Sequence, residues 1–311
     1  MPPEGAEVCG VGRVTAADVR RWKADPAQGQ AEVKVLEARM QRNGEAGLAR
    51  MAARLAAGNE HQQVAARLMM GDRDGAAMLA ERSGDVLAYQ MALTACGGAR
   101  EGAPHCARLN PRRWAEMDPT DARPWLRLME EARDRKDEAA VSAALAEAAA
   151  RPRLSRGSFL LEAQAVVTAD VIPDAAELGP ALVAIIGIDA MSQRFDLGAP
   201  LRICRGEGLQ DPTRLGHCRS LARQALANAS DLMDASAAQS MAERVGLPRE
   251  QRAYDAATLK AAQEKFMERV LADIGMDCAA MRRMKQLSTE RAASGELATA
   301  LALLPPGKSA R

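Results

Sequence analysis

The chain has 311 residues, and its 42 lysines and arginines nearly balance its 41 aspartates and glutamates, so the net charge is close to zero. This balance argues against a general nucleic-acid-binding protein, because such a protein needs a basic face to displace counterions from the phosphate backbone, although it leaves a local basic patch open. Aromatic residues make up only 3% of the chain, while alanine, leucine and methionine are abundant. The composition therefore favours helices over sheets and predicts an all-α protein.

The start of the chain, residues 1–14, is rich in proline and glycine and predicts a flexible segment. It lacks the apolar run of a secretory signal, and the sequence leaves open whether a signal or anchor segment precedes Met1. The most apolar stretch, residues 178–188, is too short to span a bilayer. We therefore expect that stretch to be a buried helix, and expect no membrane insertion.

Helix-start and helix-end signals follow one another from residue 15 onward. Thr15 predicts the N-cap of the first helix, with Asp18 at its third position. Several short helices are expected between residues 31 and 95, and two of them are expected to end at Gly44 and Gly58. Asn59 is then expected to cap the next helix.

The clearest helix signals lie between residues 110 and 152. Asn110 and Pro111 predict an N-cap followed by a first-turn proline. Asp121 is expected to cap the next helix, and a turn at residues 136–137 leads to a third. This stretch predicts an antiparallel pair of helices.

The same stretch resembles a tetratricopeptide repeat, a helix–turn–helix unit with a tryptophan and a leucine on its first helix, small residues on its second helix and a closing proline. The resemblance covers residues 119–152, about one repeat. The matching positions are Pro119, Trp125, Leu128, Val141, Leu145 and Ala148, and the departures are Met129, Ala132 and Pro152. The resemblance implies antiparallel helical hairpins stacked as a solenoid-like array, with a concave groove that holds a peptide or partner protein.

The C-terminal half is also predicted to be helical. Two helices separated at Pro173 are expected between residues 155 and 196, and further amphipathic helices follow a break at residues 197–200. We therefore expect an N-terminal helical-repeat region at 15–153, a C-terminal helical region packed on it at 154–304, and a flexible tail at 305–311.

Two cysteine stretches, residues 94–109 and 203–221, share one pattern: a cysteine, a polar loop with glycine, and a His-Cys pair. Because both loops are expected to join neighbouring helices, the pattern predicts disulfides Cys96–Cys106 and Cys204–Cys218. Cys9 and Cys278 could pair only if the two ends of the chain meet, which the sequence leaves open. Disulfides indicate an oxidising compartment, so we expect a periplasmic or extracellular protein.

His105 and His217, beside two of these cysteines, are the site candidates that the pattern offers. They would become metal ligands or general bases if the cysteines were free, although neither stretch has the spacing of a structural zinc site or a thiol-redox catalyst. We expect neither metal nor organic cofactor, because no phosphate-binding loop or known hydrolase signature occurs.

The acidic residues Glu130, Glu131 and Asp134 could form a catalytic pair, but a solvated face balanced by Arg127, Arg133 and Arg135 is the alternative that we favour. The resemblance to a tetratricopeptide repeat, together with the predicted disulfides, implies a non-catalytic interaction or scaffold protein of the bacterial cell envelope, which binds a partner protein or peptide in a concave groove. The alternatives are a helical hydrolase or lyase with an acidic pair, and a metal- or redox-responsive protein that uses the His-Cys loops.

Overall fold

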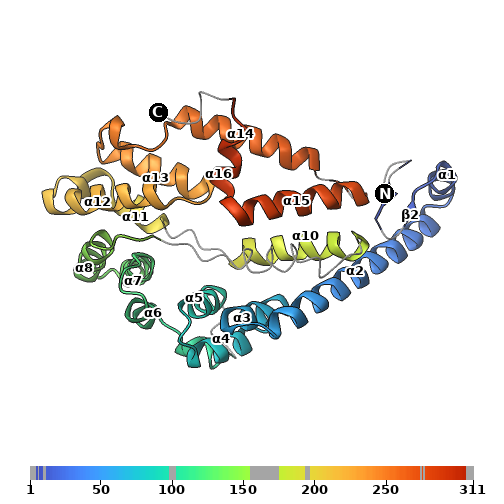
Figure 1. Cartoon of the computed structure of the whole chain (residues 1–311), viewed down its shortest axis with the longest axis horizontal. Coiled ribbons are helices and arrows are strands. Elements are labelled where there is room, and N and C mark those ends of the chain that lie inside the picture. Colours follow the sequence, from blue (N-terminus) through green and yellow to red (C-terminus); the bar gives the residue numbers. More distant parts are fainter. Residues whose placement is uncertain are drawn as a thin grey trace.

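The chain is predominantly helical in this computed structural model, which describes residues 5, 7–9, 12–97, 103–154, 175–192, 197–273, 275 and 277–305 (Figure 1). Within those ranges it has fifteen α-helices, three short 3₁₀ segments (η1, Cys106–Arg108; η2, Gly206–Leu209; η3, Arg249–Gln251) and a two-stranded antiparallel hairpin. The predicted all-α class is therefore confirmed.

The hairpin consists of β1 (Glu7–Val8) and β2 (Gly12–Arg13). The α-helices are α1 (Ala16–Ala24), α2 (Pro26–Ala56), α3 (Glu60–Met69), α4 (Arg73–Arg82), α5 (Val86–Ala95), α6 (Pro111–Met117), α7 (Arg123–Asp134), α8 (Glu138–Ala149), α10 (Ala175–Ser192), α11 (Gly198–Ile203), α12 (Pro212–Asn228), α13 (Leu232–Arg244), α14 (Ala256–Asp273), α15 (Cys278–Ser294) and α16 (Glu296–Leu301).

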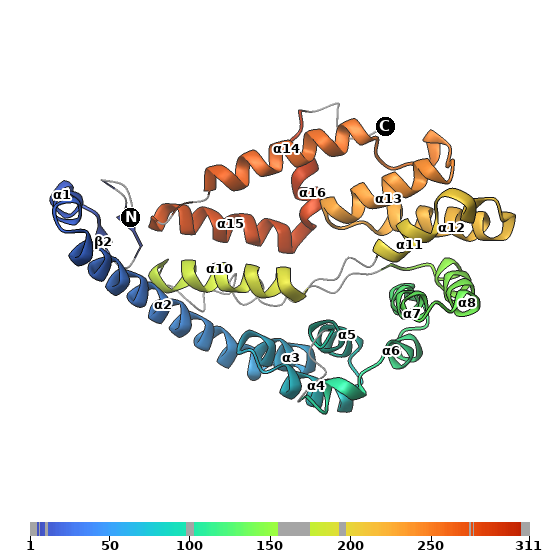
Figure 2. The same cartoon turned by 180° about the vertical axis from the view of Figure 1, so that it is seen from behind.

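Neighbouring helices pack side by side and together form a flat ring (Figures 1 and 2). Contacts run from α2 through α3, α5, α6 and α7 to α8, then from α8 to α12, and on through α13 and α14 to α15. Helix α10 lies between α15 and α2 and contacts both of them. The ring of helices is thereby closed, and the N-terminal hairpin comes near the start of α15, where Cys9 and Cys278 form a disulfide (Figure 1).

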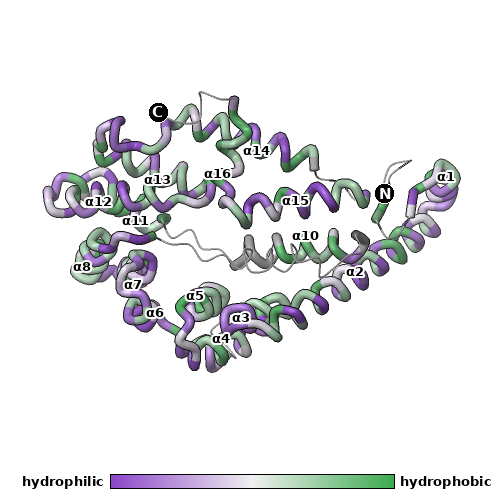
Figure 3. Tube along the Cα trace, viewed as in Figure 1, coloured by the Kyte–Doolittle hydropathy of each residue, from purple (hydrophilic) through white to green (hydrophobic). Residues whose placement is uncertain are grey.

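Three large clusters of buried apolar side chains form the core, and a small fourth cluster of Cys9 and Met281 lies between the hairpin and α15. The first joins α2–α6 with α10, the second joins α7 and α8 with α11–α13, and the third lies among α13–α16. The first two clusters each contain residues from both sides of the predicted boundary at 153/154. Along most helices hydrophilic and hydrophobic residues are interspersed (Figure 3), as expected for helices buried on one side.

Most of the predicted helix starts are confirmed. Thr15 and Asn59 each form a capping box, and Asn110 accepts a hydrogen bond from the backbone N–H of Arg113. Helix α7 differs slightly, because Ala122 is its N-cap residue while the buried Asp121 accepts from the backbone N–H of Arg123. Helices α7 and α8 form the predicted helical hairpin; whether it is a tetratricopeptide repeat stays a prediction.

The prediction that a helix ends at Gly44 is wrong. Helix α2 runs without interruption from Pro26 to Ala56, and Gly44 and Gly47 are buried within it. A Cβ atom at Gly47 would lie 2.7 Å from the carbonyl oxygen of Glu177 on α10. Gly47 therefore lies where α10 packs against the long helix, and neither glycine breaks that helix.

The N-terminal segment also differs from the prediction. Its described residues form the β1–β2 hairpin, in which Glu7 pairs with Arg13 and Val8 with Gly12. Val8 and Cys9 are buried, and Cys9 forms a disulfide with Cys278. This part of the predicted flexible segment is thus tied to the far end of the chain.

The apolar stretch 178–188 is confirmed as part of a helix, α10, where Leu178, Ala181, Leu182 and Ile185 are buried. The other helix predicted before Pro173 lies outside the described residues, as does most of the predicted tail at 305–311.

Candidate functional site

The six cysteines form three disulfides. Cys96–Cys106 and Cys204–Cys218 pair as predicted, with Cα–Cα distances of 5.3 and 5.7 Å. Cys9 and Cys278 also pair, at 4.7 Å, because the chain ends meet. Three disulfides fit a non-cytoplasmic protein.

The cysteine loops differ from expectation in one respect. Cys218 lies within α12, rather than in a loop, and pairs with Cys204 at the end of α11. All six sulfur atoms are engaged in disulfides, so the thiolates that the metal- and redox-responsive alternatives require do not exist in this state.

The two candidate histidines do not come together. His105 lies beside α4, with its Nδ1 atom 3.0 Å from Glu81, which also pairs with Arg108. The hydrogen bond with His105 and the charge of Arg108 hold the pKa of Glu81 below its usual value. His217 is half-buried on α12, which lies well away from α4 in both views (Figures 1 and 2).

The acidic residues of α7 form surface ion pairs. Glu130 lies 3.3 Å from Arg202, and Asp134 lies 2.9 Å from Arg133. These contacts are those of a solvated face. The prediction that Arg127 belongs to this face is wrong, because Arg127 is buried.

Arg127 belongs to the core beside α6. Its guanidinium lies 5.2 Å from the ring centre of Trp114, and that of Arg123 lies 5.3 Å from the same ring. Arg127 also donates a 2.7 Å hydrogen bond to the Thr94 hydroxyl at the end of α5. Burial of a guanidinium over an indole ring is a stabilising cation–π arrangement that connects α5, α6 and α7.

A pocket of about 340 Å³ lies at the other end of the molecule, between the β1–β2 hairpin, α1 and the first turns of α2. Its apolar walls are Val8, Val14, Trp22, Val35 and Leu36, and its charged lining residues are Arg13, Asp18, Arg21 and Glu32. Val8, Val14 and Trp22 are buried, whereas the Val35 side chain at the rim is 65% exposed. The volume lies in the range of small-molecule and anchor-residue sites.

Local sequence builds this pocket. Asp25 ends α1 and caps α2, and Pro26 follows as the first residue of α2, so the two helices meet at a sharp corner. Gly29 is buried at that corner, where a Cβ atom would lie 2.8 Å from the Cβ atom of Trp22. The absence of a side chain at Gly29 thus lets the indole of Trp22 lie against α2.

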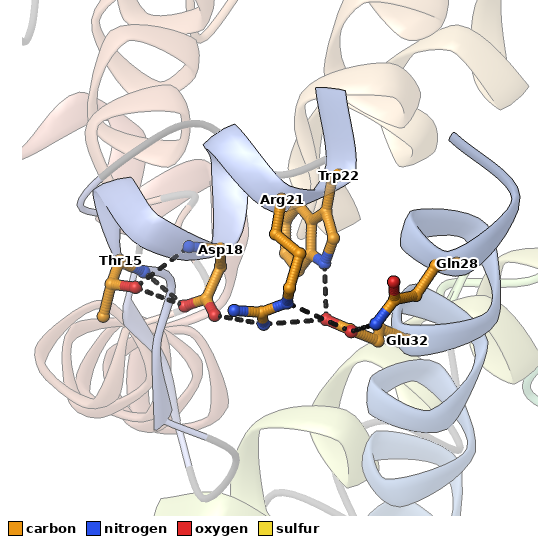
Figure 4. Close-up of polar contacts among 6 residues, drawn as sticks. All are labelled: Thr15, Asp18, Arg21, Trp22, Gln28 and Glu32. Atoms are coloured by element: carbon orange, nitrogen blue, oxygen red, sulfur yellow. Dashed lines mark hydrogen bonds and ion pairs between the residues drawn. The ribbon is translucent and has the colours of Figure 1, made fainter. Parts of the chain in front are cut away.

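Glu32 is the centre of the polar network (Figure 4). Its Oε1 atom accepts from Arg21 Nε at 3.2 Å and from Gln28 Nε2 at 3.1 Å. Its Oε2 atom accepts from Arg21 Nη2 at 2.9 Å and from the indole N–H of Trp22 at 2.7 Å. Four donors therefore occupy this carboxylate and fix the indole that forms a pocket wall.

Asp18 connects the network to the start of α1. One oxygen accepts from the backbone N–H and the hydroxyl of Thr15, at 2.8 and 2.6 Å, and the other accepts from Arg21 at 2.6 Å. Hydrogen bonds from Thr15 and then from Arg21 lower the pKa of Asp18 to about 2.

The same contacts set the charge of the other groups. Hydrogen bonds from Arg21 and then from Trp22 lower the pKa of Glu32 below its usual value, and Glu32 in turn raises the pKa of Arg21. Asp18, Glu32 and Arg21 are therefore all charged near neutral pH. The arrangement can position an apolar ligand, but its two carboxylates are poorly suited to accept a proton.

The sequence prediction missed this site because it treated residues 1–14 as flexible. Cys9 was the signal that could have indicated otherwise, since a cysteine that pairs with another element anchors its own segment. Among the described residues, no group of three or more His, Cys, Asp or Glu side chains is placed to hold a metal ion. The helices of the described ranges also include none that is long and apolar enough to cross a membrane.

Comparison with protein-family models, curated proteins and solved structures finds no match to this chain.

Proposed function

We propose that the chain is a non-catalytic interaction protein, and that an apolar side chain of a partner protein or peptide binds in the N-terminal pocket. The observation that carries this proposal is the pocket itself. It combines about 340 Å³ of space, apolar walls and a wall residue, Trp22, fixed by a hydrogen bond to Glu32. A site that is already ordered binds an anchor residue without the entropic cost of arranging its own side chains.

The polar network supports binding over catalysis. A general acid or base needs a pKa near the operating pH and a free oxygen or nitrogen directed at the reacting atom. Glu32 accepts four hydrogen bonds and Asp18 accepts three, and the pKa of each is lowered. Their role in the proposal is to hold Arg21 and Trp22 in place.

The proposed setting is the periplasm or the exterior of a bacterial cell, where three disulfides persist. The pairwise packing of successive helices supports the further proposal of a solenoid-like array, and the α7–α8 hairpin supplies its tetratricopeptide-like unit.

Selection from a displayed library of random peptides on the oxidised protein tests the proposal. We expect the selected peptides to share one apolar anchor residue and to lose affinity by about tenfold on Leu36→Glu, which puts a charge into the pocket wall. Met70→Glu is the matched control, because Met70 is an exposed apolar residue outside the pocket. Peptides that bind the Leu36→Glu variant unchanged, or a selection with no enriched peptide, would overturn the proposal.

A further inference from the structure

The charged residues of the pocket differ in how many of their hydrogen-bonding atoms already have a partner within the protein. Arg21 forms ion pairs with Asp18 and Glu32, at 2.6 and 2.9 Å. Both Glu32 oxygens accept two hydrogen bonds each, and both Asp18 oxygens also accept. A ligand could use the Glu32 carboxylate only by displacing a donor that the protein already supplies, whereas one Asp18 oxygen accepts from Arg21 alone.

Arg13 is the exception. It lines the pocket from β2, its side chain is exposed, and it forms no ion pair or side-chain hydrogen bond with the described residues. Glu7 is its partner in the strand register, but the two side chains form no ion pair. The pocket thus presents one guanidinium whose donors are available to a ligand.

The backbone that carries Arg13 is held from several sides. The backbone N–H of Gly5 donates to the carbonyl of Val14 at 3.0 Å. Val8 in β1 and Val14, which follows β2, are both buried and line the pocket. The disulfide between Cys9 and Cys278 ties the hairpin to α15. The guanidinium therefore projects from an ordered strand beside an apolar cavity.

We propose that the pocket binds an apolar group that carries a carboxylate, with Arg13 binding the carboxylate and the apolar walls enclosing the rest. The inference rests on the proposed function and adds the chemistry of the anchor. A guanidinium binds a carboxylate through two parallel hydrogen bonds, which gives direction as well as attraction. A volume of about 340 Å³ corresponds to about eleven water-sized groups. A medium-chain carboxylic acid and the apolar C-terminal residue of a peptide both have this size and chemistry.

Isothermal titration calorimetry of the full oxidised chain tests the inference with three probes of equal chain length: octanoate, 1-octanol and octyltrimethylammonium. We expect octanoate to bind about fivefold more tightly than 1-octanol, as for a partly exposed charge-assisted pair, and the ammonium to bind most weakly. Arg13→Gln should abolish the preference for octanoate. Arg20→Gln should retain it, because Arg20 is an exposed arginine on α1 outside the pocket.

A second pair of probes identifies the source of the carboxylate: a short neutral peptide ending in phenylalanine with a free carboxylate, and the same peptide as its amide. Tighter binding of the peptide with the free carboxylate than of its amide would assign the site to the C-terminus of a peptide or protein. Binding of octanoate but of neither peptide would assign the site to a small carboxylic acid. Either result supports the inference. Equal binding of octanoate, octanol and the ammonium, or an unchanged preference in Arg13→Gln, would overturn the inference and leave the proposed function standing. Binding of none of the probes would overturn the inference, and the peptide selection would then decide the proposed function.

Discussion

The Cys9–Cys278 disulfide joins residues 269 positions apart. In the chain-entropy description, closing a loop of that length in the unfolded chain stabilises the fold by about 5.5 kcal/mol. The other two disulfides join residues 10 and 14 positions apart, for which the same relation gives about 3 kcal/mol each. Replacing Cys9 and Cys278 together with serine should therefore lower the free energy of unfolding about twice as much as replacing Cys96 and Cys106.

The loss should also have a local component at the hairpin. Each strand has two residues, and a hairpin of this size is marginal in water without further anchors. Without the disulfide, we expect the hairpin to open before the helices unfold. The pocket would then lose the walls formed by Val8 and Val14, and the position of Arg13.

Urea unfolding followed by far-ultraviolet circular dichroism would measure the global effect on the parent protein and both double variants. Amide hydrogen exchange over residues 7–14 would measure the local effect. A Cys9/Cys278 variant that loses no more stability than the Cys96/Cys106 variant would refute the loop-closure reasoning. Unchanged exchange over residues 7–14 would show that the hairpin does not depend on the disulfide.

Three further predictions follow from individual contacts. Gly47→Ala should destabilise the protein by about 1–3 kcal/mol, because the new Cβ atom would lie 2.7 Å from a carbonyl oxygen of α10. Gly216→Ala should instead stabilise the protein by about 0.5–1 kcal/mol, because Gly216 is an exposed helical residue with open space beside it. Urea unfolding would contradict this contrast if the two substitutions changed the free energy of unfolding in the same direction. Thr94→Val should lower the free energy of unfolding by about 1–3 kcal/mol, because it removes a hydrogen-bond acceptor of the buried Arg127. Thermal unfolding measures the effect, and an unchanged melting temperature would show that this hydrogen bond is dispensable. The carboxyl of Asp18 should titrate near pH 2, well below its ordinary pKa of 3.8. Its contribution to stability is therefore present above about pH 4 and is lost as the pH falls through about 2. A carbon-detected NMR titration with a midpoint near 4 would contradict the hydrogen-bond network around Asp18.

The features that could be predicted from the sequence are those set by neighbouring residues. An N-cap such as Thr15 or Asn110 accepts hydrogen bonds from residues two or three positions ahead, so its role is visible in a short window. The pairing of Cys96 and Cys204 with the next cysteine along the chain is local in the same sense.

The features that were wrongly predicted depend on distant partners. Gly44 was expected to end a helix, but a buried glycine where two helices cross is equally compatible with the local sequence. Only the packing of α2 against elements distant in the sequence distinguishes the two cases. Arg127 was placed on a solvated face because its neighbours on α7 are charged, whereas Trp114 and Thr94 bury it. Periodicity within one helix cannot reveal which side a preceding helix covers.

The candidate site combines both kinds of information. The described residues that line the pocket all lie between Val8 and Leu36, so its composition is local. One wall is the β1–β2 hairpin, which a disulfide joins to Cys278 near the other end of the chain. The position of this wall therefore depends on a residue that is distant in the sequence. The two like-patterned cysteine pairs account for four of the six cysteines, and the remaining two then have only each other. Cys9 and Cys278 were therefore the long-range constraint that the sequence contained. That constraint places the N-terminal segment against α15 and makes a segment expected to be flexible into one wall of the pocket.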